Sequence, residues 1–206
     1  MSANGKFAAN PEDTCAVALL LIDVINDFEY PGGEALFKHA LPTARHIATL
    51  KRRAQQRHIP IIYANDNFGK WRAERSQIVR HCLEDGVRGE PIVRLLAPDE
   101  RDYFVLKPQN SGFYQTPLDL LLAYLKVKTP ILAGFAGDIC VLLTAADAYM
   151  RDFQLVIPSD CSASQETAEN EHALRYAARV LDADTTASPD LNLGDLLARV
   201  SQTSRR

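Results

Sequence analysis

The sequence predicts an α/β fold of three layers: helices, a six-stranded and mainly parallel sheet, and helices again. Two observations carry this prediction. Short, continuous apolar runs recur along the chain, and a helical pattern separates most of them. Such runs are typical of strands buried on both faces, and alternation of strand and helix favours parallel pairing. No internal repeat or low-complexity linker divides the chain. We therefore expect one domain over residues 15–200, preceded by a polar tail of residues 1–14.

Five apolar runs are the expected strands, and a weaker sixth follows them. The runs cover residues 16–22, 60–65, 103–106, 130–135 and 154–158, with the sixth around 183–186. The expected helices cover residues 42–57, 118–127, 140–151 and 166–181. Thr116 is a predicted N-cap, followed by Pro117 at a position that proline favours at the start of a helix. Since one helix is expected to begin at Cys140, its thiol is predicted to lie at a strand-to-helix turn.

Composition and charge exclude several functional classes. The chain has 206 residues, 47% of them hydrophobic, and a formal net charge of −3, which gives no electrostatic case for binding nucleic acid. No apolar run approaches the length of a membrane span, and the N-terminus lacks the apolar core of a secretory signal. The four cysteines form no CxxC pair. We therefore expect a cytoplasmic protein with reduced thiols and a small-molecule partner.

Three chemically active side chains follow different expected strands. Asp23 follows the first strand, Lys107 the third, and Cys140 the fourth, while the amide of Asn65 ends the second. Ligands of open α/β sheets gather at the carboxyl ends of the strands. A carboxylate, an amine and a thiol are therefore predicted to meet at one edge of the sheet.

This combination suits nucleophilic catalysis by a thiol. The pKa of an ordinary thiol is about 8.5, so a nucleophilic cysteine needs help at neutral pH. Asp23 can accept the thiol proton, and both Lys107 and the start of a helix are expected to stabilise a thiolate. The turn GFAGDIC before the helix can aim backbone amides at a developing oxyanion.

Each of these residues also has a structural interpretation. A free cysteine is more often a small buried hydrophobe than a nucleophile. Asp23 can serve as a strand-end cap, Lys107 as a solvated loop residue, and the glycines of the turn as a means of close packing. The case for catalysis depends on their convergence at one sheet edge.

Four segments resemble motifs of the isochorismatase-like cysteine hydrolases. They are LLLIDVINDF (19–28), KPQNSGFYQTPLDLLL (107–122), GFAGDICVLLTAADA (134–148) and PSDCSAS (158–164). They occur in the family's order, and the resemblance runs from residue 16 to about 187. It implies a catalytic triad of Asp23, Lys107 and Cys140. It also implies a cis peptide at Phe135–Ala136, an oxyanion hole made by the amides of Ala136, Gly137 and Cys140, and a homodimer or homotetramer.

The sequence departs from the family's pattern at two places. Ile25 stands where the family often has glutamine. Asn67 and Phe68 follow Asp66, where nicotinamidases of the family have an Asp-x-His metal motif, and no histidine lies between His58 and His81. Because imidazole ligands are missing there, we expect no metal and no cofactor. All histidines are expected at surface or helix-end positions: His39, His46, His58, His81 and His172.

The expected function is hydrolysis of a non-peptide C–N bond in a small amide, ureide or carbamoyl compound. The residues expected to line the substrate pocket are Phe28, Asn65, Phe68, Trp71, Phe113 and Tyr114. Two alternatives stay open. One is vinyl-ether hydrolysis of the isochorismatase type, against which Cys140 argues because that reaction accompanies loss of the cysteine in the family. The other is a catalytically idle protein that only binds.

Overall fold

The computed structural model describes residues 13–66 and 74–203, so most of the expected N-terminal tail lies outside the described part. Its centre is a parallel sheet of five strands in the order β3-β2-β1-β4-β5. The strands are β1 (Val17–Ile22), β2 (Ile61–Asp66), β3 (Tyr103–Lys107), β4 (Thr129–Phe135) and β5 (Ser162–Ala163). The predicted α/β class is confirmed, with five strands instead of six.

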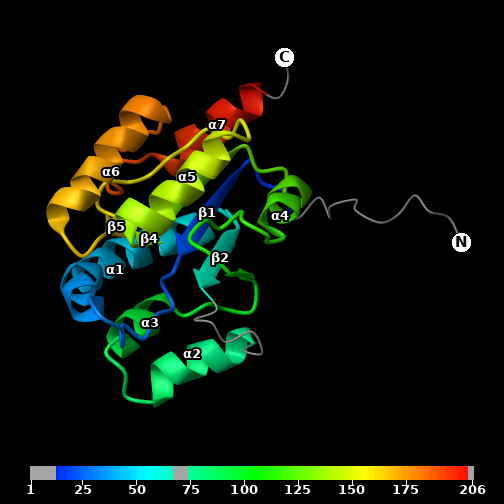
Figure 1. Cartoon of the computed structure of the whole chain (residues 1–206). Helices are drawn as coiled ribbons and strands as arrows, with labels where there is room; N and C mark the ends of the chain where they lie inside the picture. The colour runs from blue at the N-terminus through cyan, green and yellow to red at the C-terminus, as the bar shows by residue number, and fades with distance from the viewer. Residues whose placement is uncertain (1–12, 67–73, 204–206) are drawn as a thin grey trace, which may run out of the picture.

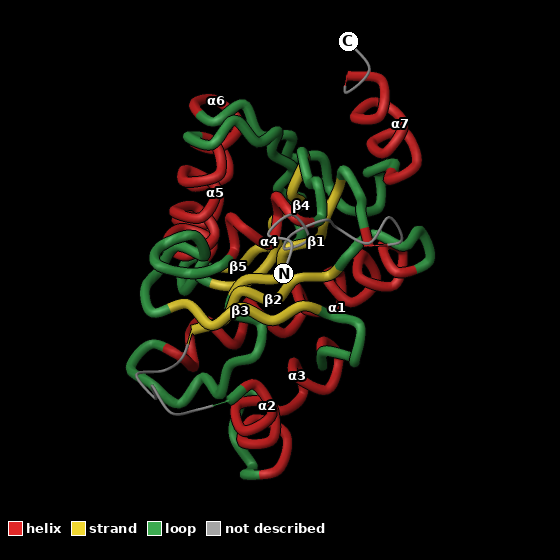
Figure 2. Tube along the Cα trace, turned by 90° about the vertical axis from the view of Figure 1, so that its right-hand side faces the viewer, coloured by secondary structure: helices red, strands yellow, loops and turns green. Residues whose placement is uncertain are grey.

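Helices cover both faces of the sheet (Figure 1). The helical elements are α1 (Gly33–Gln55), α2 (Arg75–Glu84), α3 (Glu90–Leu96), α4 (Leu118–Tyr124), η2 (Gly137–Val141), α5 (Leu142–Tyr149), α6 (Thr167–Val180) and α7 (Leu193–Thr203). Alternate residues of β1 divide the core in two. Leu19 and Leu21 pack with residues of α1 and α3, whereas Leu20 and Ile22 pack with residues of α4 and α5. Figure 2 shows the strands between these two groups of helices.

Two of the expected strands are reduced to isolated bridges. Residues 154–158 and 183–186 were expected as strands, but these segments form parallel bridges at single residues: Val156 pairs with Ile131 and with Asp184. The Leu132 amide donates to the Val156 carbonyl over 2.8 Å, and the Ile157 amide to the Asp184 carbonyl over 2.8 Å. Pro158 has no amide hydrogen with which to continue the ladder. The sheet instead adds β5 a few residues later.

Several helix boundaries also differ from expectation. Helix α1 begins at Gly33 and contains Pro42, which was expected at its start. Helices α2, α3 and α7 were not predicted. Thr116 was the predicted N-cap, but the N-cap of α4 is Pro117, one residue later. The Thr116 hydroxyl instead accepts a hydrogen bond from the Leu118 amide at 3.2 Å. None of the helices described is both long and apolar enough to span a lipid bilayer.

Candidate active site

Asp23, Lys107 and Cys140 meet at the carboxyl edge of the sheet. Lys107 Nζ lies 2.8 Å from Asp23 Oδ2 and 3.7 Å from Cys140 Sγ. Asp23 directly follows β1, Lys107 ends β3, and Cys140 lies in η2 just after β4. The Lys107 side chain is fully buried and that of Asp23 is 8% exposed. The structure therefore brings an ammonium group, a carboxylate and a thiol together away from bulk water.

The backbone around Asp23 fixes its carboxylate. Asp23 has a left-handed conformation, with φ of 53°. Its Oδ1 accepts a hydrogen bond from the Asp66 amide at 2.8 Å, which leaves Oδ2 facing Lys107. On the other side of β1, Gly134 has φ of +144°, and a Cβ there would lie 2.0 Å from the Ile22 carbonyl oxygen. Glycine is thus needed for β4 to approach the end of β1.

The loop after β3 contributes three further contacts. Lys107 Nζ donates to the Gln109 carbonyl at 3.1 Å, and the Cys140 thiol lies 3.9 Å from Asn110 Oδ1. The Gly112 amide donates to Thr144 Oγ1 at 2.9 Å, and this hydroxyl donates to the Cys140 carbonyl at 2.7 Å. These bonds join the lysine loop to the helix that carries the thiol. Asn110 was not singled out from the sequence, although it lies in the lysine motif.

Burial, together with the charge of Asp23, keeps the thiol protonated at rest. Burial, followed by the charge of Asp23, raises the pKa of Cys140 to about 12, against a smaller lowering by Lys107. This differs from the expectation of a thiolate at a helix start, because Cys140 is nearly buried beside a carboxylate. Burial also raises the pKa of Asp23, although Lys107 opposes it. The pKa of Lys107 is raised: burial lowers it, but the negative charge and the hydrogen bond of Asp23, with a further contribution from the neighbouring Cys140, outweigh burial.

The turn before Cys140 is formed without a cis peptide. All peptide bonds are trans across the described ranges, so the expectation for Phe135–Ala136 is wrong. Ala136 instead has a left-handed conformation, with φ of 53° and ψ of 61°, which reverses the chain after β4. Cys140 then lies in the π-helical turn η2, ahead of α5. Residues other than glycine adopt this left-handed backbone conformation at a cost in free energy, and residues strained in this way often cluster at functional sites.

A cavity of about 400 Å³ opens beside the thiol. Its described lining residues are Asp23, Asn26, Asp27, Glu29, Tyr30, Leu36, Asp66, Phe135, Ala136 and Cys140. Besides Asp23, the carboxylates of Asp27, Glu29 and Asp66 line the cavity and give its wall an acidic character. The acidic side chains of the wall were missed in the sequence because half of the described lining residues come from the loop after β1, where side-chain direction follows no simple period.

Two of the residues expected in the pocket, Phe28 and Asn65, are absent from its described wall. Phe28 is buried against Phe37 and Phe135, with ring centroids 5.6 and 5.7 Å away. Asn65 is also buried, and it accepts from the Ile25 amide at 3.0 Å and donates to the Ile25 carbonyl at 2.8 Å. Both side chains therefore support the site from behind its wall.

Two further predicted pocket residues are absent from the described wall, and two cannot be placed. Phe113 is buried, and its ring packs with Phe153 at 6.1 Å. Tyr114 is half exposed, outside the cavity. Phe68 and Trp71 lie outside the described residues.

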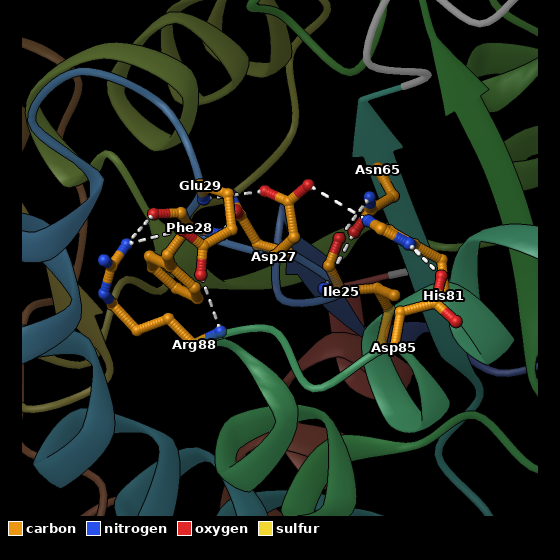
Figure 3. A network of polar contacts seen from close by, with 9 residues as sticks. Ile25, Asp27, Phe28, Glu29, Asn65, His81, Asp85 and Arg88 are labelled. Atoms are coloured by element: carbon orange, nitrogen blue, oxygen red, sulfur yellow. Dashed lines mark hydrogen bonds and ion pairs between the residues drawn. The ribbon is translucent and has the colours of Figure 1, made fainter.

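A polar network holds the loop that forms the cavity wall (Figure 3). His81 of α2 lies between two carboxylates, with Nε2 3.3 Å from Asp27 Oδ2 and Nδ1 2.7 Å from Asp85 Oδ2. Arg88 Nη1 lies 3.3 Å from Glu29 Oε2, and the Arg88 amide donates to Glu29 Oε1 at 2.9 Å. His81, expected at a surface or helix-end position, lies in the last turn of α2, where its side chain is two-thirds buried and fastens the loop to that helix.

Within residues 13–66 and 74–203, no cluster of three or more histidine, cysteine, aspartate or glutamate side chains could hold a metal ion.

Comparison with known proteins identifies the family. The isochorismatase domain model matches residues 17–188, which is most of the chain. The chain belongs to the isochorismatase family. It is 44% identical over 174 residues to an uncharacterized isochorismatase family protein, YaaI of Bacillus subtilis, covering 84% of this chain and 95% of that protein.

Two further proteins that resemble this chain are named as amidohydrolases or amidases. The ureidoacrylate amidohydrolase RutB of Methylobacterium radiotolerans is 27% identical over 183 residues, covering 75% of this chain and 71% of that protein. The crystal structure of N-carbamoylsarcosine amidase from Thermoplasma acidophilum has a TM-score of 0.65 and 26% identity, covering 85% of this chain and 98% of that one. Amidohydrolases are therefore among the relatives of this isochorismatase-family chain.

Proposed function

We propose that this chain is a cysteine hydrolase that cleaves a non-peptide C–N bond of a small amide, ureide or carbamoyl compound. The observation that carries the proposal is the contact of Lys107 Nζ with both Asp23, at 2.8 Å, and the Cys140 thiol, at 3.7 Å, beside a cavity. A buried base next to a thiol satisfies the geometry of nucleophilic catalysis.

The first half of the reaction forms an acyl-enzyme. Because the thiol is protonated at rest, Asp23 takes its proton as Sγ of Cys140 attacks the substrate carbonyl carbon. The backbone amides of Ala136, Gly137 and Cys140 hold the oxygen of the tetrahedral intermediate. When the C–N bond breaks, the protonated Asp23 gives its proton to the leaving nitrogen. A thioester on Cys140 remains.

The second half regenerates the thiol. Asp23, again ionised, takes a proton from a water molecule that attacks the thioester carbonyl. The carbon–sulfur bond breaks, the acid product leaves, and Cys140 recovers its proton from Asp23. Lys107 stays charged throughout, because its pKa is raised, and its ammonium group lowers the cost of each negative charge that forms near it.

The names of the relatives support the choice of substrate class. N-Carbamoylsarcosine and ureidoacrylate both contain a carbamoyl group attached to nitrogen, which is a compact, polar acyl group. A cavity of about 400 Å³ is at the small end of the range for ligand pockets. A small carbamoyl compound or amide therefore fits better than a peptide.

Mass spectrometry of the intact protein tests this proposal. After incubation with a panel of ureas, amides and carbamoyl compounds and a rapid acid quench, we expect a covalent adduct on Cys140 with at least one turned-over compound. Cys140→Ala should lose both the adduct and turnover. The matched control is Cys15→Ala, because Cys15 is a free cysteine that precedes β1, at the opposite end of that strand from Asp23. Full turnover by Cys140→Ala would overturn the mechanism.

A further inference from the structure

A chain of three hydrogen bonds fastens the turn before Cys140 to the neighbouring part of the fold. The Asp138 amide donates to Ser164 Oγ at 3.0 Å, and this hydroxyl donates to Asn170 Oδ1 at 3.3 Å. Asn170 Nδ2 then donates to the Ser162 carbonyl at 3.2 Å. Along this series of hydrogen bonds, each hydrogen has one donor and one acceptor: the Ser164 hydroxyl accepts one bond and donates the next, and the Asn170 carboxamide accepts through Oδ1 and donates through Nδ2. The turn of η2 is thereby joined to β5 and to α6.

The same asparagine fills the space behind Gly137. A Cβ at residue 137 would lie 2.0 Å from Asn170 Oδ1 and 3.3 Å from Ser162 Cβ. No real Cβ approaches an oxygen so closely, so the absence of a side chain at Gly137 and the presence of Asn170 depend on each other. The carboxamide of Asn170 therefore packs directly against the backbone of the turn.

The backbone amides of the turn have different surroundings. Ser164 engages the amide of Asp138, on the side of the turn that faces β5 and α6. Ala136 and Cys140 lie on the other side, in the wall of the cavity. Holding the Asp138 amide fixes the rotation of the adjoining peptide planes. An error of about 1 Å in such a position can cost about a hundredfold in rate.

We propose that Asn170 and Ser164 are positioning residues, which hold the Ala136–Asp138 turn so that its remaining amides face the substrate oxygen. This inference rests on the proposed function, because it assumes a tetrahedral adduct on Cys140. Neither residue touches the thiol in the structure, and both act through the backbone of the turn.

The test uses an aldehyde that needs no knowledge of the natural substrate. Propionaldehyde labelled with carbon-13 at its carbonyl carbon adds to a thiol: the sulfur–carbon bond forms, and the thiol proton moves to the oxygen. The resulting thiohemiacetal has its own NMR signal, and Cys140→Ala shows which signal belongs to this site. We expect Asn170→Ala and Ser164→Ala each to weaken formation of the adduct by about tenfold or more.

A second measurement separates positioning from loss of structure. Alkylation of Cys140 by iodoacetamide at pH 8.5 forms no oxyanion, so its rate should be unchanged in Asn170→Ala and Ser164→Ala. Alanine is a better helix former than asparagine, so Asn170→Ala should keep α6 folded. The matched control is Asn192→Ala, which removes an asparagine that accepts from the Gly194 amide at 3.0 Å at the start of α7. It should leave both measurements unchanged.

A double substitution tests the packing of Asn170 on Gly137. Gly137→Ala alone should weaken the adduct, because its Cβ collides with Asn170 Oδ1. In the Asn170→Ala background the oxygen is gone, so the added methyl group should cost several-fold less. Such a coupling between two neighbours is the result expected of a direct contact.

The possible outcomes distinguish the two proposals. If the wild-type protein forms no thiohemiacetal on Cys140, the proposed function and this inference both fail. If it does form one, and Asn170→Ala binds the aldehyde as tightly as wild type, the proposed function stands and the positioning role is overturned. An equal loss in aldehyde affinity and in alkylation rate would also overturn it, since that result indicates general disruption of the site.

Discussion

Lys107 and Asp23 form a buried ion pair of 2.8 Å at the carboxyl edge of the sheet, and Lys51 and Asp102 form another of 2.8 Å just before β3. Both lysine side chains are at most 8% exposed. The second pair also has the Tyr63 hydroxyl 2.8 Å and the Ala97 carbonyl 2.9 Å from Lys51 Nζ. The chain thus provides two comparable buried ion pairs, and it is Lys107 that lies 3.7 Å from the Cys140 thiol.

Lys107→Met and Lys51→Met should therefore have similar effects on stability and different effects on chemistry. Each leaves a buried carboxylate without its partner, so the free energy of unfolding should fall by about 3 kcal/mol in each, as measured by denaturant titration. Only Lys107→Met should abolish formation of the acyl adduct on Cys140. Equal loss of the adduct in folded Lys51→Met would argue against a specific role for Lys107.

Asp23→Asn should separate the ionisation of the thiol from turnover. After burial, the charge of Asp23 is the next cause that raises the pKa of Cys140, whereas Lys107 lowers it. Removing that charge should lower the pKa of the thiol, so the alkaline rise in iodoacetamide alkylation should move to lower pH. Turnover should nevertheless be lost, because no group remains to protonate the leaving nitrogen. A shift of the alkylation profile to higher pH would contradict this view of the site.

Cys140 should also make stability depend on alkaline pH. Its pKa is raised by burial to about 12 in the folded protein, from an ordinary value of 9.0. Between these values the folded state keeps a proton that the unfolded chain releases, so the stabilisation is present below pH 9 and is lost as pH rises toward 12. The stability difference between wild type and Cys140→Ala should fall by up to about 1.4 kcal/mol per pH unit in this window.

Denaturant titration of both proteins at several alkaline pH values checks this prediction. Cys161, whose pKa burial also raises to about 12, is present in both proteins, so the difference reports on Cys140. A difference that stays constant from pH 9 to 12 would contradict the raised pKa.

His81→Ala should weaken substrate binding more than the chemical step. His81 contacts Asp27, which lines the cavity, but it lies outside the described cavity wall itself. Loosening the loop should raise KM by several-fold while kcat changes less. The control is His172→Ala, since His172 is an exposed residue of α6 with only a 4.0 Å contact to Glu169. If KM is the same in His81→Ala and His172→Ala, the position of the loop in the cavity wall does not depend on His81.

The acidic cavity wall predicts a preference for uncharged substrates. Asp27, Glu29 and Asp66 line the cavity together with Asp23, and the described wall contains no lysine or arginine. Butylurea should therefore be turned over more efficiently than N-carbamoyl-β-alanine, which has a similar length but carries a carboxylate. Glu29→Gln should narrow the difference in kcat/KM. A preference for the charged compound would show that the described wall does not set the selectivity.

Much of the fold could be predicted because the signals are local. The continuous apolar runs of β1 and β4 mark strands buried on both faces, and the side chains that follow such strands must lie at one sheet edge. Asp23, Lys107 and Cys140 could be singled out in this way. The expected strands at 154–158 and 183–186 were overestimated, because apolar character alone does not show where Pro158 and the following turn interrupt pairing.

The sequence by itself determined the fold class, the family and the order of the residues around the sheet edge, because strand burial and strand ends depend on near neighbours in the chain. Only the tertiary structure decided the protonation of Cys140, since burial beside Asp23 outweighs Lys107. It also decided how the cavity wall is held in place, by His81 of α2 and by Arg88 of the loop between α2 and α3, neither of which lines the cavity. Those effects depend on groups that are distant in sequence, and folding alone brings them into contact.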